Sequence, residues 1–338
     1  MSESPSTSKK RVFSGMQPSG EAHLGNYLGA LKSWVEMQDS YECIFCIVDD
    51  HAITAGSDPA DMPANVFDLA VSYLAVGLDP EKCTIFVQSD VPQHTELAWL
   101  FNAVTPVGDL ERMTQYKDKS QRFESVPAGI LNYPILQAAD ILLYRADAVP
   151  VGEDQRQHLE LTREIARKWN AAYQADYFPE PAALIGKAGK ILGLDGNAKM
   201  SKSLGNTVRI LADEDEIWSR VRTAMTDPQR VRRDDPGRPE VCNVFSLHAH
   251  FTDADTIADI DTRCRAGTIG CVDCKKILAT NIGIAFAPMR ERAEEFRANP
   301  GLVRDVLDQG ATKARAIASE TIAEVKGAMG LDWRRALD

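Results

Sequence analysis

The chain of 338 residues is longer than a single small core requires and is long enough for two domains. Its 44% hydrophobic and 26% charged residues are typical of soluble globular proteins, and no apolar run reaches the roughly 18 residues of a membrane-spanning helix. The net charge of -11 excludes broad electrostatic adhesion to nucleic acid, so any contact with RNA must be local. The first ten residues are polar and lack the apolar core of a signal peptide, which predicts a disordered tail on a cytoplasmic protein.

The chain first shows a β-prone run at Arg11–Ser14, then a turn-rich segment, and then a helical pattern from Leu24. A loop that feeds a helix N-terminus suits phosphates, because free backbone N–H groups and the positive end of the helix dipole meet there. His23 and Asn26 stand at this entrance with N–H groups for phosphate oxygens, and Gly25 lets a ligand approach the backbone. An ordinary strand-to-helix turn with a surface histidine is the alternative.

The next stretches alternate between helical and strand-like patterns. In chain order they are an amphipathic helix at 26–38, a buried strand at 41–48, a helix at 63–77 with proline at its start and glycine at its end, and a strand at 84–88. This β-α-β-α-β order predicts an α/β fold with a doubly wound, parallel, Rossmann-like sheet, whose ligands lie at the carboxyl ends of the strands. Asp50 and His51 follow the second strand and fall at such an end, although helix capping also explains them.

Cys43 and Cys46 form a C-x-x-C pair inside the predicted second strand. Residues three apart on a strand face opposite sides of the sheet, so the two thiols do not converge on one metal ion. Both cysteines are therefore predicted to lie in the core.

From His94 to Tyr144 the strand rhythm gives way to helical segments, which predicts an insertion between two halves of the nucleotide-binding fold. The last part of this insertion, 128–144, is strongly apolar but contains Asp140. An unpaired carboxylate in such surroundings costs several kcal/mol, so Asp140 must cap a helix, pair with a partner or meet a donor on a ligand. The residues alone favour the first two roles.

Two later segments have the character of nucleotide-binding turns. Gly152–Gln155 follows a short strand-like run and precedes a helix at 155–169, so its acidic residues stand at a helix start, where N-capping is the ordinary explanation. Further on, Lys199 and Lys202 flank a small serine in a glycine-rich segment that starts near Ile191. Such a loop either folds over a polyphosphate or is simply solvated.

Beyond Asn206 the pattern changes to helices and charged linkers. Long helices are predicted at Lys275–Ala298 and Leu302–Met329, which together indicate a helical domain. A loop with six arginines within nineteen residues precedes them and either meets RNA phosphates or is solvated. These arginines are Arg220, Arg222, Arg230, Arg232, Arg233 and Arg238.

The segment HLGN at His23–Asn26, followed far downstream by KMSKS at Lys199–Ser203, resembles the two nucleotide-binding sequences of the class I aminoacyl-tRNA synthetases. Asn26 stands where many members carry a second histidine. Four further stretches resemble the bacterial tryptophanyl-tRNA synthetases, and the resemblance runs from about Val12 to the C-terminus. These stretches are GMQPSG at 15–20, DDHAIT at 49–54, NYPILQAADILLY at 132–144 and PVGEDQRQHLELTREIA at 150–166.

This resemblance implies ATP-dependent activation of L-tryptophan, with Mg²⁺ accompanying ATP, and transfer of the tryptophanyl group to tRNA(Trp) by a homodimer. It implies a catalytic domain at 11–206 and a helical anticodon-binding domain at 207–338, whose last helix packs back on the catalytic part. The implied catalytic residues are His23, Asn26, Lys199 and Lys202. The implied ATP-binding residues are Gln17, Pro18, Ser19, Gly25, Asn26, Gly152, Glu153, Asp154, Ile191, Lys199, Met200, Ser201, Lys202 and Ser203.

On the amino-acid side, the resemblance implies that Asp140 accepts the indole N–H of tryptophan, with Tyr133 near the same pocket. It also places Gln155 near the substrate amino group and includes His51 among the substrate-binding residues. Many relatives carry methionine where this chain has Gln137, so that wall of the pocket is left open.

Two other functions fit parts of this pattern. A tyrosyl-tRNA synthetase shares the fold and would direct Tyr133 and Asp140 to a phenol, but GMQPSG and PVGEDQ favour tryptophan. A catalytically inactive nucleotide-binding protein that binds RNA is the second alternative, and the intact HLGN and KMSKS segments argue against it.

Cys242, Cys264, Cys271 and Cys274 place four of the seven cysteines within a 33-residue window. Disulfides are disfavoured in a cytoplasmic chain, which leaves chance, zinc or an iron–sulfur cluster. Zinc ribbons usually carry two C-x-x-C knuckles, whereas one close pair with two outlying thiols suits a [4Fe–4S] cluster as well or better. The spacing also resembles that of a subset of bacterial tryptophanyl-tRNA synthetases with such a cluster in the helical domain. We therefore expect a cluster that orders RNA-facing helices and takes no redox part in the reaction.

Overall fold

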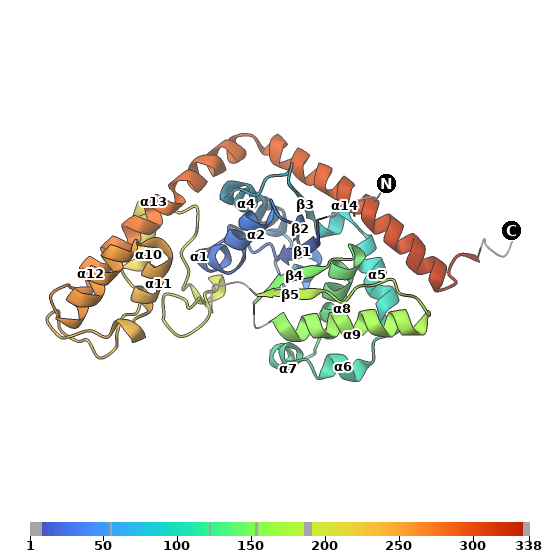
Figure 1. The fold of residues 1–338 in the computed structure, drawn as a ribbon, viewed down its shortest axis with the longest axis horizontal. Helices are drawn as coiled ribbons and strands as arrows, with labels where there is room; N and C mark the ends of the chain where they lie inside the picture. The colour runs from blue at the N-terminus through green and yellow to red at the C-terminus, as the bar shows by residue number, and fades with distance from the viewer. Residues whose placement is uncertain (1–8, 55, 122, 153–154, 186–190, 334–338) are drawn as a thin grey trace, which may run out of the picture.

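A computed structural model describes residues 9–54, 56–121, 123–152, 155–185 and 191–333. Its centre is a five-stranded sheet in the order β3-β2-β1-β4-β5, in which every neighbouring pair is parallel (Figure 1). This order confirms the predicted doubly wound fold, because β1 lies in the middle and the chain winds outward from it in both directions. The strands are β1 (Arg11–Met16), β2 (Glu42–Ile47), β3 (Cys83–Val87), β4 (Ala148–Val151) and β5 (Ala182–Ile185).

The helices of the first half cover both faces of this sheet, with α2 and α4 on one side and α8 and α9 on the other (Figure 1). The predicted helix at 26–38 is interrupted by a π-helical turn at Tyr27–Leu31. The helix predicted at 63–77 is α4, which is closed by Gly77 in the left-handed conformation at φ +106°. The bounds are α1 (Leu24–Asn26), α2 (Lys32–Met37), α3 (Asp49–Ile53), α4 (Met62–Val76), α5 (Gln93–Asn102), α6 (Val107–Glu111), α7 (Thr114–Ser120), α8 (Ala128–Leu143) and α9 (Arg156–Ala172).

Alternate residues of the central strands point into two hydrophobic cores, one on each face of the sheet. Cys43 belongs to the core that contains Val12, whereas Cys46 belongs to the core that contains Phe13. The exposed fractions of the two thiols are 2% and 0%. The prediction that both cysteines of this C-x-x-C pair lie in the core, on opposite faces of the sheet, follows from the period of two along a strand and is confirmed.

The second half of the chain is helical. Three helices gather at one end of the molecule, the long α13 leads from them to the sheet, and α14 crosses the sheet to the far end (Figure 1). The two long helices were both predicted within a few residues. The bounds are α10 (Glu214–Val221), α11 (Asn243–Phe251), α12 (Ala254–Arg265), α13 (Cys271–Ala298) and α14 (Pro300–Ala328).

Helix α14 packs directly on β3, the edge strand of the sheet. A Cβ atom at Gly310 would lie 1.8 Å from the carbonyl oxygen of Ile85, so only glycine allows this approach. On the other side of the same contact, the Thr321 hydroxyl donates to the carbonyl of Leu143 at the end of α8 (2.8 Å). Helix α14 is therefore fixed to both the sheet and the inserted helices. None of the helices among the described residues combines the length and apolar character needed to span a bilayer.

Candidate active site

His23 caps the N-terminus of α1, just beyond the carboxyl end of β1. Its Nδ1 accepts the backbone N–H of Asn26 (3.2 Å), while its own backbone N–H donates to Oδ1 of Asn26 (3.0 Å). Because Nδ1 is an acceptor, the proton of the neutral ring lies on Nε2. Burial, together with the charges of Lys202 and Lys199, lowers the pKa of His23 from 6.5 to about 4. His23 is therefore a neutral N–H donor throughout the physiological pH range.

The lysine-rich segment forms a hairpin-like loop that closes on Asn206. Asn206 is buried, its Oδ1 accepts the backbone N–H of Ser201 (2.8 Å), and its Nδ2 donates to Asp195 (2.8 Å). A Cβ atom at Gly193 would lie 2.0 Å from this amide nitrogen, so the loop needs glycine there. The sequence pattern did not indicate the roles of Asn206 and Asp195, because both side chains act through contacts with residues that lie elsewhere in the loop.

Backbone pairing brings this loop to the His23 entrance, although the two lie far apart in the sequence. The N–H of Leu24 donates to the carbonyl of Val208 (2.8 Å), and the N–H of Ile210 donates to the carbonyl of Ala22 (3.1 Å). Met200 is buried and packs against the entrance, because a Cβ atom built at Gly25 would lie 3.0 Å from the Cβ atom of Met200. The structure therefore joins the HLGN and KMSKS segments into one unit.

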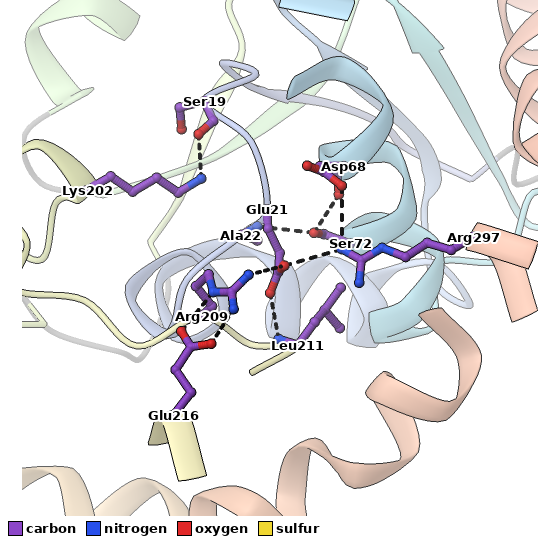
Figure 2. Close-up of polar contacts among 10 residues, drawn as sticks. All are labelled: Ser19, Glu21, Ala22, Asp68, Ser72, Lys202, Arg209, Leu211, Glu216 and Arg297. Atoms are coloured by element: carbon purple, nitrogen blue, oxygen red, sulfur yellow. Dashed lines mark hydrogen bonds and ion pairs between the residues drawn. The ribbon is translucent and has the colours of Figure 1, made fainter. Parts of the chain in front are cut away.

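Lys202 reaches from the loop across the entrance, where its ammonium group donates to the carbonyl of Ser19 (2.5 Å) (Figure 2). Burial lowers the pKa of Lys202, whereas the nearby carboxylates of Glu21 and Asp68 act in the opposite direction. Lys199 is more exposed, yet its charge also reaches His23. Two cations and a neutral imidazole N–H thus converge on one entrance, which is a site for a polyanion.

The other predicted ATP-binding residues fall around the same entrance or on the facing strand end. In the turn after β1, Gln17 and Ser19 are exposed and Pro18 is buried. The carbonyl of Ile191 accepts the N–H of Met200 (3.3 Å). Gly152 is exposed at the end of β4, while Glu153 and Asp154 lie outside the described residues, and nothing is described of the Ser203 side chain.

Asp140 is buried on α8 and has several protein partners. Its Oδ2 accepts from Nε2 of His51 (2.8 Å), and its Oδ1 accepts from Nε2 of Gln88 (2.7 Å) and pairs with Nδ1 of His94 (2.7 Å). The Nε2 of His94 in turn meets the hydroxyl of Tyr144 (2.8 Å). Burial alone would raise the pKa of Asp140, but His51 and His94 outweigh it and hold that pKa at about 2. The carboxylate is therefore charged, and pairing is the role that the structure displays.

The remaining amino-acid-side residues lie near this carboxylate to different degrees. The ring centroid of Tyr133 is 6.5 Å from that of His51. The hydroxyl of Tyr133 contacts Gln115 (3.0 Å) and His158 (2.8 Å). Gln137 is half-buried one turn before Asp140 on α8. Gln155 is the N-cap of α9, and its backbone N–H donates to the carbonyl of Gly152 (3.0 Å).

The four clustered cysteines come together from separate helices of the second half. Cys242 precedes α11, Cys264 lies on α12, and the C-x-x-C pair opens α13. All four are half-buried, and burial and then the charges of the other three thiols raise the pKa of Cys274 to about 12. Across the part of the chain that the structure describes, no three His, Cys, Asp or Glu side chains are gathered tightly enough to hold a single metal ion.

Comparisons with known proteins identify the family of the chain. Residues 5–287 match the family described as tRNA synthetases class I (W and Y). The chain is 54% identical over 325 residues to the tryptophan–tRNA ligase of Deinococcus radiodurans, covering 95% of this chain and 98% of that protein. It is 44% identical over 327 residues to the tryptophan–tRNA ligase of Thermotoga maritima, covering 95% of this chain and 99% of that protein.

Solved structures give the same result for the fold. The crystal structure of tryptophanyl-tRNA synthetase from Campylobacter jejuni complexed with ADP and tryptophan superposes with a TM-score of 0.85 at 36% identity, covering 95% of this chain and 99% of that one. The chain therefore belongs to the class I tRNA synthetases, among the bacterial tryptophanyl-tRNA synthetases, and its activity is that of a tryptophan–tRNA ligase.

Proposed function

We propose that the entrance built from His23 and the lysine loop binds ATP and that the carboxylate pocket around Asp140 binds tryptophan. The observation that carries this assignment is the backbone pairing of residues 22–24 with 208–210, which fixes Lys202 beside His23. The adenine and ribose bind along Gln17–Ser19, Gly152 and Ile191, and the phosphates bind against Gly25 and the KMSKS loop.

In the first step, a carboxylate oxygen of tryptophan attacks the α-phosphorus of ATP. The bond between the α-phosphorus and the oxygen that bridges it to the β-phosphorus breaks, and pyrophosphate leaves. In the second step, a ribose hydroxyl at the 3′ end of tRNA(Trp) attacks the acyl carbon, loses its proton and releases AMP. Such steps depend on alignment and charge stabilisation more than on covalent chemistry. His23 and Asn26 hold phosphate oxygens, and Lys199 and Lys202 stabilise charge that develops on the leaving pyrophosphate. Mg²⁺ enters with ATP and neutralises part of the phosphate charge.

On the amino-acid side, Asp140 accepts the indole N–H while His51, His94 and Gln88 keep the carboxylate charged and oriented. Three protein donors leave capacity on a carboxylate, which has about four lone-pair sites. Tyr133 and Gln137 line the same pocket from α8, and Gln155 faces the amino group from the start of α9.

The second half of the chain, residues 207–338, receives the anticodon of tRNA(Trp) in this proposal, and the protein acts as a homodimer. Several of the six clustered arginines make contacts within the chain. Arg220 donates to the carbonyls of Thr207 and Gly205, and Arg238 pairs with the buried Asp227. Arg233, whose side chain is 82% exposed, is better placed for RNA phosphates.

The test is amino-acid-dependent exchange of pyrophosphate into ATP. We expect exchange with tryptophan and at least about 10⁴-fold less with tyrosine, because the phenol carries its O–H donor at a different point of the side chain from the indole N–H and would leave Asp140 unpaired in a pocket shaped for indole. Exchange with tyrosine alone would assign the chain to the tyrosyl branch. No exchange with either amino acid would support the catalytically inactive alternative.

We also propose that Cys242, Cys264, Cys271 and Cys274 hold a [4Fe–4S] cluster that orders the helices facing the tRNA. The residues fit such a group in two respects: the four thiols lie within electrostatic reach of one another, and Arg230 contacts the sulfur of Cys264 (3.5 Å). A four-iron cluster binds each thiolate to a different iron, so it accepts sulfurs spread more widely than the ligands of one zinc ion. When bound, the cluster supplies structural cross-linking of these helices.

Protein purified without oxygen should be brown, absorb broadly near roughly 400 nm and contain about four irons per chain. Cys271→Ser should lose most of the iron and lower the melting temperature, whereas Cys83→Ser, a change at a buried core thiol, should keep the iron. Stoichiometric zinc without iron, or colourless metal-free protein, would contradict the cluster.

A further inference from the structure

Glu21 stands two residues before His23, and its buried carboxylate is shared by three segments of the chain (Figure 2). Oε1 accepts the backbone N–H of Leu211 (3.0 Å). Oε2 pairs with Arg209 (3.2 Å) and with Arg297 (3.3 Å). The exposed fraction of the Glu21 side chain is 6%, so the charge is largely removed from water and is compensated by these donors.

Two of these donors belong to the C-terminal root of the lysine loop. Arg209 and Leu211 flank the residue that pairs with Ala22, so the Glu21 side chain extends the backbone pairing by one further hydrogen bond. Arg209 also makes an ion pair with Glu216 at the start of α10. The root of the loop is therefore clamped between Glu21 on one side and α10 on the other.

The third donor comes from the helical half of the molecule. Arg297 lies in the last turn of α13, the helix that opens with the C-x-x-C pair, and it also pairs with Asp68 on α4 (3.4 Å). In the same place the N–H of Ala22 donates to the hydroxyl of Ser72 on α4 (3.1 Å). Figure 2 shows Arg297 and Arg209 reaching Glu21 from opposite sides. One carboxylate thus links the entrance loop, the root of the lysine loop and α13.

We propose that Glu21 is a positioning residue for adenylate formation. It fixes the positions of Lys202 and His23 relative to each other, and it transmits the effect of Arg297 on α13 to the ATP site. The proposal rests on the function assigned above. Lys202 sits at the far end of a short segment whose other end is fixed by Glu21, so a loss of this tie lets the ammonium group move away from the developing charge on pyrophosphate. In the function proposed above, tryptophan lies in the pocket around Asp140, and the partners of Glu21, which are Leu211, Arg209 and Arg297, are not part of that pocket.

Glu21→Gln tests this proposal, because it keeps the shape of the side chain and an acceptor for Leu211 but removes the charge that pairs with both arginines. We expect kcat/KM for ATP in pyrophosphate exchange to fall by about 10- to 100-fold, the effect of losing charge-assisted hydrogen bonds. KM for tryptophan should stay within about twofold of wild type. Arg297→Gln should give a smaller loss of about three- to tenfold, and the double variant should lose no more than Glu21→Gln alone, because Arg297 acts through Glu21.

Asp227→Asn is the matched control. Asp227 is also a buried carboxylate that accepts from an arginine side chain and from backbone N–H groups, but these partners, Gln229 and Arg238, belong to the helical half and not to the contacts of Glu21. The Asp227→Asn variant should lower the melting temperature, as Glu21→Gln does, and should leave kcat and KM for ATP unchanged.

An equal loss for ATP and tryptophan in Glu21→Gln, or the same kinetic loss in Asp227→Asn, would reduce Glu21 to a stability role and overturn the proposal. Additive losses in the double variant would overturn the relay from Arg297. If Glu21→Gln fails to fold, Arg297→Gln decides the question, because the Arg297 side chain is 41% exposed and its replacement disturbs the core less. Wild-type kinetics with ATP in Arg297→Gln would refute the link between α13 and the ATP site. Absence of exchange in the wild-type protein would instead contradict the proposed function itself.

Discussion

Replacing Lys202 with alanine should lower the rate of tryptophan-dependent pyrophosphate exchange by about 10²–10³-fold, the effect of removing one preorganised donor in a transition state. The ammonium group is fixed at the carbonyl of Ser19 beside His23, where charge develops as pyrophosphate leaves. Lys199→Ala should have an effect of the same order, while KM for tryptophan changes little. Single-turnover measurement of adenylate formation gives the rate directly.

The control is Lys82→Ala, which removes an exposed lysine that pairs with Asp39 at the opposite, amino end of the sheet. It should keep the wild-type rate. A Lys202→Ala protein that binds ATP more weakly but forms adenylate at the normal rate would show that the lysine acts in ground-state binding and not on the transition state.

Asp140→Asn should reduce kcat/KM for tryptophan by an amount equivalent to about 1.5–3 kcal/mol, the usual size of a hydrogen bond to a charged group, with little change in KM for ATP. Asparagine keeps the shape of the side chain, whereas Asp140→Ala leaves the donors on His51, His94 and Gln88 without an acceptor and therefore also destabilises the fold.

An analogue of tryptophan with sulfur in place of the indole N–H separates recognition from stability. The wild-type protein should prefer tryptophan strongly, and Asp140→Asn should lose most of this preference, because only the N–H contact differs between the two substrates. If a folded variant keeps the preference, Asp140 does not read the indole and its role is confined to the internal network with the histidines.

The sequence predicted the strands and helices whose patterns are set locally. The strands β1 to β3 and the helix α4 were found within two residues, because burial on both faces of the strands, a proline in the first turn of the helix and a glycine directly after its end are features of adjacent residues. The strand β5 was not predicted, since AALI at Ala182–Ile185 is half-exposed and shows no alternation. The π-helical turn at Tyr27–Leu31 was also missed, because its apolar spacing fits an ordinary helix equally well.

The candidate site divides in the same way. His23, Lys199 and Lys202 were visible because their motifs are contiguous, and the need of Asp140 for a partner followed from its apolar surroundings. The identity of the partners did not follow. Glu21 meets Arg297 across 276 positions and Asp140 meets His94 across 46, and such contacts depend on how whole elements pack, which no local pattern records.

The cover that α14 places on β3 has a consequence for synthesis on the ribosome. An edge strand exposes unpaired N–H and C=O groups that pair readily with other chains. Residues 83–87 leave the ribosome more than two hundred residues before Pro300–Ala328 can dock, so the nascent sheet passes through a period with its edge uncovered. The contact of Gly310 with Ile85 ends that period, and a side chain at position 310 would prolong it by preventing docking. Such a change would lower the yield of soluble protein during expression before it altered any step of catalysis.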